Sequence, residues 1–266
     1  MVVMNNKKIL NPGPGYVINQ NYRVNYEVSP KRIRVIYKNE VIVDAINALI
    51  LYETKHVPVY YFPRDSVDIK KLEPSNLKTN CPYKGDASYY SIIVNNYKAE
   101  NAVWSYEHPF DEIAGIKDYL AFYWNKVDHW YEEDEEVFVH ARSPRVRIDI
   151  LDSSRKITVL INDEIIAQTV RARVLVETNH PTRYYIPRED VIAQLLPSST
   201  TSCCPYKGKA RYYSIKVGGV IYENIVWFYK DPVRESSKID DYLCFYNEKV
   251  DRISVDHVSE IKGNSK

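Results

Sequence analysis

A five-residue segment, Cys-Pro-Tyr-Lys-Gly, brings a thiol and a primary amine close together, and the chain carries it twice, at 81–85 and 204–208. A loop thiol beside a lysine can have a lowered pKa and act as a nucleophile. A lysine followed by glycine in a tight loop can instead bind a phosphate or a carboxylate. The repeated segment therefore allows two kinds of chemistry, covalent catalysis by the cysteine and anion binding by the lysine.

Covalent catalysis by Cys81 and Cys204 would need a base. The histidines that recur at matching positions are His56 and His180, both distant from the cysteines in sequence. The alternative is a structural role, in which the thiol serves as a small apolar side chain. No catalytic residue is assigned from the sequence.

Anion binding by Lys84 and Lys207 could use Arg64 and Arg188 as bidentate partners. In the alternative interpretation, each lysine hydrogen-bonds loop carbonyls and each arginine pairs with an acidic neighbour such as Glu53. No Gly-x-x-x-x-Gly-Lys-Ser/Thr segment occurs in the sequence, which excludes a phosphate-binding P-loop.

A Trp-x-Tyr pattern also occurs twice, as Trp104 with Tyr106 and as Trp227 with Tyr229. Side chains alternate along a strand, so both aromatic rings of each pair lie on one face, which can be core or the wall of a pocket. With the tyrosines of the preceding strand, each copy has more phenol groups than a dry core easily satisfies. The predicted ligand-binding residues are Lys84, Lys207, Arg64, Arg188, Tyr89, Tyr212, Trp104, Trp227, Tyr106 and Tyr229.

Metal and cofactor sites are not expected. The four cysteines, Cys81, Cys203, Cys204 and Cys244, contain no Cys-x-x-Cys spacing. Nucleotidyl transfer would need carboxylates that converge on Mg²⁺, and no Asp-x-Asp pair occurs among the acidic residues that the two copies share. We therefore predict no metal and no cofactor.

The copies are related by constant offsets. The segment 22–67 matches 146–191 at a shift of 124, and from Cys81 to Asp128 the shift is 123, with 27 of 48 positions identical. Such identity without a gap indicates an internal duplication. We predict a first domain at 16–130 and a second at 143–258.

An acidic linker is predicted between the domains, at 131–142. It contains the run Glu132-Glu133-Asp134-Glu135-Glu136, which is typical of a solvated segment. The remaining residues, 1–15 and 259–266, are predicted to be flexible tails.

Composition narrows the class of protein. The 36 basic residues nearly balance the 35 acidic ones, so no global field favours nucleic acid or an anionic membrane. No run of about 18 apolar residues is present, and Met1 to Leu10 lacks the apolar core of a signal peptide. We expect a soluble protein of the cytoplasm that contacts neither nucleic acid nor membrane.

The secondary structure is predicted to be mainly β. Segments 32–36, 87–94 and 102–106 are rich in β-branched and aromatic residues, as strands are. Gly218-Gly219, and Asn95-Asn96 at the matching place, predict two-residue hairpin turns. Helix is expected only in short pieces, after Pro63 and Pro187 and within 111–116.

The repeated motifs resemble those of the domain of unknown function 427 family, which also carries a nucleotidyltransferase-like label. The resemblance rests on Tyr-Tyr-Ile-Pro-Arg-Glu-Asp-Val at 184–191, the extended loop at 204–212, Trp-Phe-Tyr-Lys-Asp-Pro at 227–232 and Phe-Tyr to Val-Asp at 245–251. The first copy matches almost as well. The resemblance implies a β-tent fold in each copy, with two antiparallel sheets that meet at an angle.

The favoured function is binding of a small ligand, which can carry negative charge, in an aromatic, Lys- and Arg-lined pocket of each copy. One alternative is a transferase-type enzyme that uses the Lys84 and Lys207 loops. The other is a protein-interaction scaffold in which the two copies pack on each other.

Overall fold

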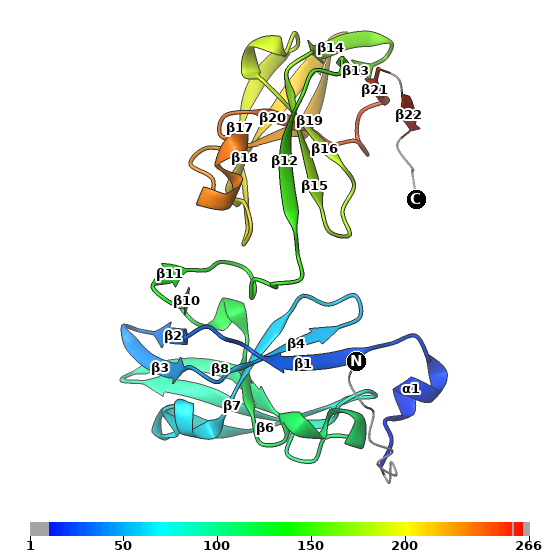
Figure 1. The fold of residues 1–266 in the computed structure, drawn as a ribbon. Coiled ribbons are helices and arrows are strands. Elements are labelled where there is room, and N and C mark those ends of the chain that lie inside the picture. Colours follow the sequence, from blue (N-terminus) through cyan, green and yellow to red (C-terminus); the bar gives the residue numbers. More distant parts are fainter. Residues whose placement is uncertain (1–10, 257, 263–266) are drawn as a thin grey trace. The chain divides into compact units, whose positions relative to one another are not determined.

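The structure, a computed structural model, describes residues 11–256 and 258–262 of the chain (Figure 1). The chain divides into two compact units, Met1–Ala141 and Arg142–Lys266. Each unit contains one seven-stranded and one four-stranded sheet, and all strand pairs are antiparallel. The prediction of a mainly β protein built from antiparallel sheets and short helices is therefore confirmed.

In the first unit the seven-stranded sheet has the order β1-β4-β5-β9-β8-β7-β6, and the four-stranded sheet has the order β11-β10-β2-β3. The strands are β1 (Val24–Val28), β2 (Ile33–Tyr37), β3 (Glu40–Ala45), β4 (Leu49–Glu53), β5 (Val59–Phe62), β6 (Leu72–Cys81), β7 (Gly85–Val94), β8 (Tyr97–Ser105), β9 (Leu120–Phe122), β10 (His129–Glu132) and β11 (Glu135–Glu136). The helices are α1 (Pro14–Ile18) and the short 3₁₀ helices η1 (Arg64–Ser66), η2 (Ile69–Lys71), η3 (Asp111–Ile116) and η4 (Trp124–Lys126).

The second unit repeats this arrangement, with the orders β12-β15-β16-β20-β19-β18-β17 and β14-β13-β21-β22. Its strands are β12 (Ile148–Ser153), β13 (Ile157–Ile161), β14 (Glu164–Thr169), β15 (Ala172–Glu177), β16 (Arg183–Ile186), β17 (Gln194–Cys204), β18 (Gly208–Val217), β19 (Val220–Tyr229), β20 (Leu243–Phe245), β21 (Arg252–Val255) and β22 (Val258–Lys262). Its 3₁₀ helices are η5 (Arg188–Asp190) and η6 (Arg234–Ile239).

The central strands of each seven-stranded sheet are buried on both faces. On β5, Tyr60 and Phe62 belong to the core that the two sheets of the unit share, whereas Tyr61 belongs to a second apolar cluster. Successive side chains of a strand point to opposite faces, so the second cluster lies on the far face of the sheet. There Ile113 and Ile116 of η3 help to cover it. This second cluster contains the residues of the candidate site.

The predicted turns are present. Gly218 and Gly219 have φ angles of 54° and 84° and join β18 to β19, and Asn95 has a φ of 52° in the matching turn. Asparagine and glycine tolerate this left-handed region better than other residues do. The short helices after Pro63 and Pro187 and at 111–116 are also present.

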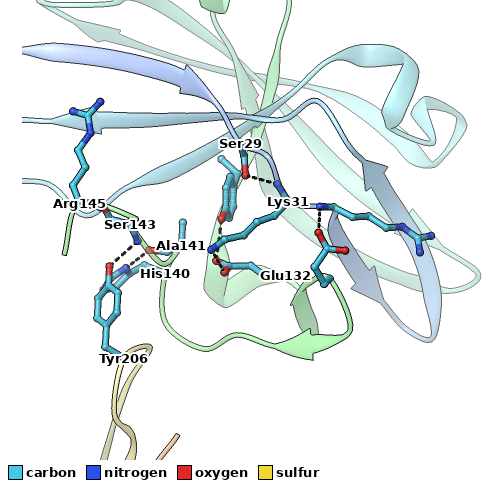
Figure 2. Close-up of polar contacts among 11 residues, drawn as sticks. Ser29, Lys31, Glu132, His140, Ala141, Ser143, Arg145 and Tyr206 are labelled. Atoms are coloured by element: carbon cyan, nitrogen blue, oxygen red, sulfur yellow. Dashed lines mark hydrogen bonds and ion pairs between the residues drawn. The ribbon is translucent and has the colours of Figure 1, made fainter. Parts of the chain in front are cut away.

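The acidic run 132–136 lies inside the first unit, in β10, β11 and the turn between them. The predicted linker, 131–142, begins within β10, which pairs with β2. Glu132 Oε2 accepts a hydrogen bond from Lys31 Nζ at 2.5 Å and Oε1 accepts one from Tyr60 at 2.9 Å, and the Glu132 side chain is only 2% exposed (Figure 2). Composition cannot distinguish this glutamate from its solvated neighbours, because its partners, the half-buried Lys31 and the buried Tyr60, are distant from it in sequence.

The predicted tails are described only in part. Residues 1–10 lie outside the described residues, as do the side chains of 259–266. Within 11–15, Gly13 and Gly15 are buried, and the Gly15 N–H donates to the Pro82 carbonyl at 2.9 Å. This part of the predicted tail therefore packs on the Cys-Pro-Tyr-Lys-Gly loop.

We predict that Glu132→Val lowers the free energy of unfolding of the first unit by about 2 to 3 kcal/mol, because a buried tyrosine hydroxyl and a lysine lose their acceptor. Valine occupies the aligned position, Val255, of the second unit. Urea unfolding followed by tryptophan fluorescence measures the change, since three of the four tryptophans lie in the first unit. The control is Asp134→Asn in the same acidic run, where the side chain is 95% exposed; equal stability of the two variants would contradict the role of Glu132.

We also predict that the fragments 1–141 and 142–266 fold separately, because every sheet and every apolar cluster of the described residues is formed within one unit. Each fragment should melt cooperatively in calorimetry. A fragment that stays unfolded, while the intact chain melts in a single transition, would show that the unit is not an independent domain.

Candidate functional site

The Cys-Pro-Tyr-Lys-Gly loop closes the hairpin between β6 and β7. Its turn is made by the Lys84 N–H, which donates to the Cys81 carbonyl at 3.2 Å. Gly85 follows with a φ of 102°, and a Cβ there would lie 3.0 Å from the His108 carbonyl oxygen. Glycine is therefore needed on grounds of both conformation and space. Gly208 has a φ of 99° in the second unit, so both loops have the same backbone requirement.

The lysine of the loop forms a buried ion pair with the end of strand β4. Lys84 Nζ contacts Glu53 Oε2, and the two side chains are only 9% and 10% exposed. Tyr22 donates its hydroxyl to Glu53 Oε1 at 2.7 Å and stacks on Tyr83, with 3.7 Å between the ring centroids. Glu53 thus pairs with the lysine and not with an arginine, the partner expected for it in the alternative interpretation of the sequence.

The second unit has the same ion pair. Lys207 Nζ lies 2.5 Å from Glu177 Oε2, and the side chains are 11% and 8% exposed. Removing one charge of such a pair leaves the other buried and uncompensated. The repeated pair therefore holds each loop against its sheet.

The Trp-x-Tyr strands supply an aromatic wall. Trp104 of β8 and Tyr106, which directly follows this strand, belong to the same apolar cluster, as the alternation of side chains predicts. Trp104 Nε1 donates to the Tyr61 hydroxyl at 3.2 Å, and the Tyr123 ring lies 4.6 Å from the indole. The hydrogen bond to Tyr61 fixes the orientation of the indole ring in the wall.

The second unit repeats this wall. Trp227 Nε1 donates to Tyr185 at 3.3 Å, and Tyr246 lies 4.4 Å from the indole ring. The Ser143 N–H donates to the hydroxyl of Tyr206, the loop tyrosine, at 2.7 Å (Figure 2). The first residues of the second unit thus also help to hold its Cys-Pro-Tyr-Lys-Gly loop in place.

A cavity of about 500 Å³ lies at the junction of the loop and the aromatic wall in the first unit. Four of its lining residues are predicted site residues, Lys84, Tyr89, Trp104 and Tyr106. The others are Tyr22, Leu51, Glu53, His56, Val57, Val59, Tyr61, Asn80, Cys81, Pro82, Tyr83 and Tyr123. The lining thus combines seven aromatic rings with one ion pair.

Three phenols of this lining, Tyr61, Tyr106 and Tyr123, stay protonated at neutral pH. Burial raises the pKa of Tyr61 and of Tyr106 well above the ordinary tyrosine value. Burial, together with a hydrogen bond between Tyr123 and Tyr89, raises the pKa of Tyr123 to about 12. The rings therefore present neutral hydroxyl groups, which can donate hydrogen bonds to a ligand.

The cavity also brings Cys81 and His56 into one lining, although they are distant in sequence. His56 is exposed and Cys81 is half-buried. Among the described residues no hydrogen bond joins the thiol to the imidazole. The two groups could therefore act together only after a side-chain rearrangement.

The predicted arginines lie elsewhere. Arg64 donates to the Tyr90 hydroxyl at 3.3 Å, and Tyr90 packs against the core between the sheets. Arg188 makes the same contact with Tyr213 at 3.1 Å. Arg64 is not among the residues that line the cavity. Because side chains alternate along a strand, Tyr89 and Tyr90 point to opposite faces of the sheet. Arg64 contacts Tyr90 and therefore lies on the face opposite the cavity.

Several lining residues are absent from the sequence-based set, among them Tyr22, Tyr61, Tyr83 and Tyr123. Recurrence at matching positions could have identified Tyr61, Tyr83 and Tyr123, whose partners are tyrosines 185, 206 and 246. It could not have identified Tyr22, because valine stands at the aligned position 146.

Within residues 11–256 and 258–262, no three His, Cys, Asp or Glu side chains are grouped so that they could hold a metal ion. None of the described helices has the length and apolar character needed to span a membrane.

A model of the family described as Domain of unknown function (DUF427) matches residues 25–133 and 149–256. A comparison with curated proteins gives no match. Each matched region contains one buried Lys–Glu pair, one Cys-Pro-Tyr-Lys-Gly loop and one Trp-x-Tyr strand. The chain therefore belongs to the DUF427 family, of which it contains two tandem domains.

Proposed function

We propose that the first unit binds a small molecule in the cavity between the loop and the aromatic wall, and that this molecule has a flat ring with a carboxylate or carbonyl oxygen. The observation that carries the proposal is a cavity of about 500 Å³ lined by seven aromatic rings and one buried ion pair. Cavities of roughly 300 to 1,000 Å³ with apolar walls and a few polar groups are typical of small-molecule sites.

The flat ring is inferred from the wall. Trp104 is half-buried, and its N–H group is already bonded to Tyr61. The face of the indole, and not its polar edge, is therefore the surface that it can offer to a ligand. Offset or edge contacts with aromatic faces contribute about 0.5 to 1.5 kcal/mol each beyond the area that they bury.

The oxygen acceptor is inferred from Lys84. Its ammonium group has three donors, and one of them meets Glu53. The group also lies 6.0 Å from the centre of the Tyr106 ring. Because Glu53 compensates most of the lysine charge, we expect one carboxylate or carbonyl to bind better than a polyphosphate, whose several charges would face the same glutamate.

An enzymatic role is the second candidate. It is favoured by Cys81 and His56, which line the same cavity as Lys84. If His56 took up the thiol proton, the Cys81 thiolate could attack a bound acyl group and displace its leaving group, while the lysine orients the substrate. The nucleotidyltransferase-like label of the family adds group transfer as a reaction class. The scaffold role and the cytoplasmic location stay predictions from the sequence.

We predict that aromatic carboxylates bind to the intact protein and that replacing both charges, Glu53→Gln with Lys84→Gln, weakens this binding roughly 10- to 150-fold, because a charge-assisted hydrogen bond contributes about 1.5 to 3 kcal/mol. Changing both partners avoids an uncompensated buried charge, so stability should be retained. The measurement is tryptophan fluorescence with benzoate, nicotinate, AMP and ATP.

The matched control is the double variant Lys98→Gln with Glu73→Gln. This pair is also in the first unit, with a distance of 3.0 Å, but its side chains are 43% and 56% exposed and it is not part of the cavity lining. It should bind nicotinate as the unaltered protein does. The proposal is contradicted if no compound binds, or if both double variants bind equally well.

The enzymatic candidate predicts that iodoacetamide alkylates Cys81 at least about 10-fold faster than the exposed Cys203 at pH 6.5, because a nearby imidazole would raise the thiolate fraction. His56→Asn should remove the excess rate. Peptide mass spectrometry measures all sites together, and Cys244 serves as the negative control, since burial raises the pKa of its thiol far above the ordinary value. Equal rates at Cys81 and Cys203 would dismiss a thiolate nucleophile.

A further inference from the structure

We infer that Arg183 closes, in the second unit, the position that the proposed ligand occupies in the first, so that the chain binds one ligand and not two. The inference rests on the proposed function and refines it. The sequence alone predicts a ligand site in each copy, because it places lysine, tryptophan and tyrosine identically in both.

At one of the positions where the cavity wall differs between the units, the second unit has a charged side chain. Val59 lines the cavity and is the first residue of β5, opposite Leu51 of β4. Arg183 is the first residue of β16, opposite Leu175 of β15. The register of β4 with β5 is therefore the same as that of β15 with β16. At this position the units differ only in the side chain, which is valine in the first and arginine in the second.

The guanidinium group of Arg183 lies over the tryptophan of its unit. Its Cζ is 5.4 Å from the centre of the Trp227 ring, within the range of a cation–π contact. The Arg183 side chain is 18% exposed, and Trp227 is buried, whereas Trp104 is half-buried. In the second unit the protein's own side chain thus occupies the face that Trp104 leaves available.

Glu248 holds the guanidinium in this place. The two Arg183 amino groups donate to the two Glu248 oxygens at 3.0 and 2.9 Å, a bidentate pair with good geometry. Asn125 stands at the aligned position of the first unit. Both partners of the pair are therefore present in the second unit, and neither is present in the first.

A second difference acts in the same direction. Tyr22 donates to Glu53 and stacks on Tyr83 in the first unit, and the aligned residue of the second unit is Val146. Valine has neither a hydroxyl group nor an aromatic ring. A ligand that fits the first unit would therefore lose a ring contact in the second as well as having to displace Arg183.

The test follows the four indole N–H signals in proton–nitrogen NMR spectra of the full-length protein, assigned by single Trp→Phe variants. The probes are TEMPOL, a neutral nitroxide that broadens signals near accessible surface, and nicotinate, a flat ring with one carboxylate. In the unaltered protein we expect TEMPOL to broaden Trp104 more than Trp227, and nicotinate to shift Trp104 alone.

Exchanging the residues at positions 59 and 183 should exchange the accessibility of Trp104 and Trp227 to TEMPOL. In Arg183→Val, which carries the residue of the first unit and should fold, the Trp227 signal should broaden clearly more with TEMPOL. In Val59→Arg with Asn125→Glu, Trp104 should become protected and nicotinate affinity should fall roughly 10-fold or more, as expected when a ligand must displace a cation–π contact and an ion pair. Glu248→Gln, which only releases the arginine, should increase broadening of Trp227 to an intermediate degree.

The possible outcomes separate the inference from the proposed function. Equal TEMPOL broadening of Trp104 and Trp227 in the unaltered protein, with no change in Arg183→Val, overturns closure by Arg183. Nicotinate shifts of both signals in the unaltered protein overturn it too, but support binding in the cavity. If nicotinate moves neither signal while TEMPOL behaves as expected, the proposed ligand class is wrong and closure by Arg183 is supported.

Discussion

A buried lysine and a buried glutamate hold the loop of each unit against its larger sheet. In the first unit the pair joins Lys84, between β6 and β7, to Glu53 at the end of β4. Such a pair is costly to remove from water, and breaking it by losing one partner is costlier still, so the loop has one place relative to the sheet. The cavity wall depends on this constraint, because Tyr83 and Cys81 belong to the same loop.

The second constraint is a sheet whose central strands are buried on both faces. Consecutive aromatic residues of a strand then pack in different apolar clusters, as Tyr60 and Tyr61 do. One set of rings fills the core between the two sheets, and the other set faces the cavity. This arrangement explains why tyrosine is useful in the second set, because a hydroxyl group such as that of Tyr61 finds a partner where phenylalanine would have none.

Much of the fold could be predicted from the sequence, because the turn residues and the alternation of apolar residues are local signals. The glycine and asparagine turns and the short helices after proline are examples. The site was harder, since it depends on pairs distant in the chain. The sequence does not reveal that Lys84 is buried, because its partner Glu53 is distant in the chain. It also suggests Arg64 as a second residue of the site, whereas Arg64 contacts Tyr90 on the other face of the sheet.

Comparison of the units separates what the fold requires from what a ligand would require. The buried ion pair, the glycine with positive φ and the tryptophan bonded to a tyrosine are the same in both. The positions that cover the indole face differ, as Val59 and Arg183 do. A residue that fixes the backbone cannot change without loss of folding, whereas a residue that only covers a ring can. At the cavity wall, a change such as Val59 to Arg183 therefore alters what can bind without altering the sheet.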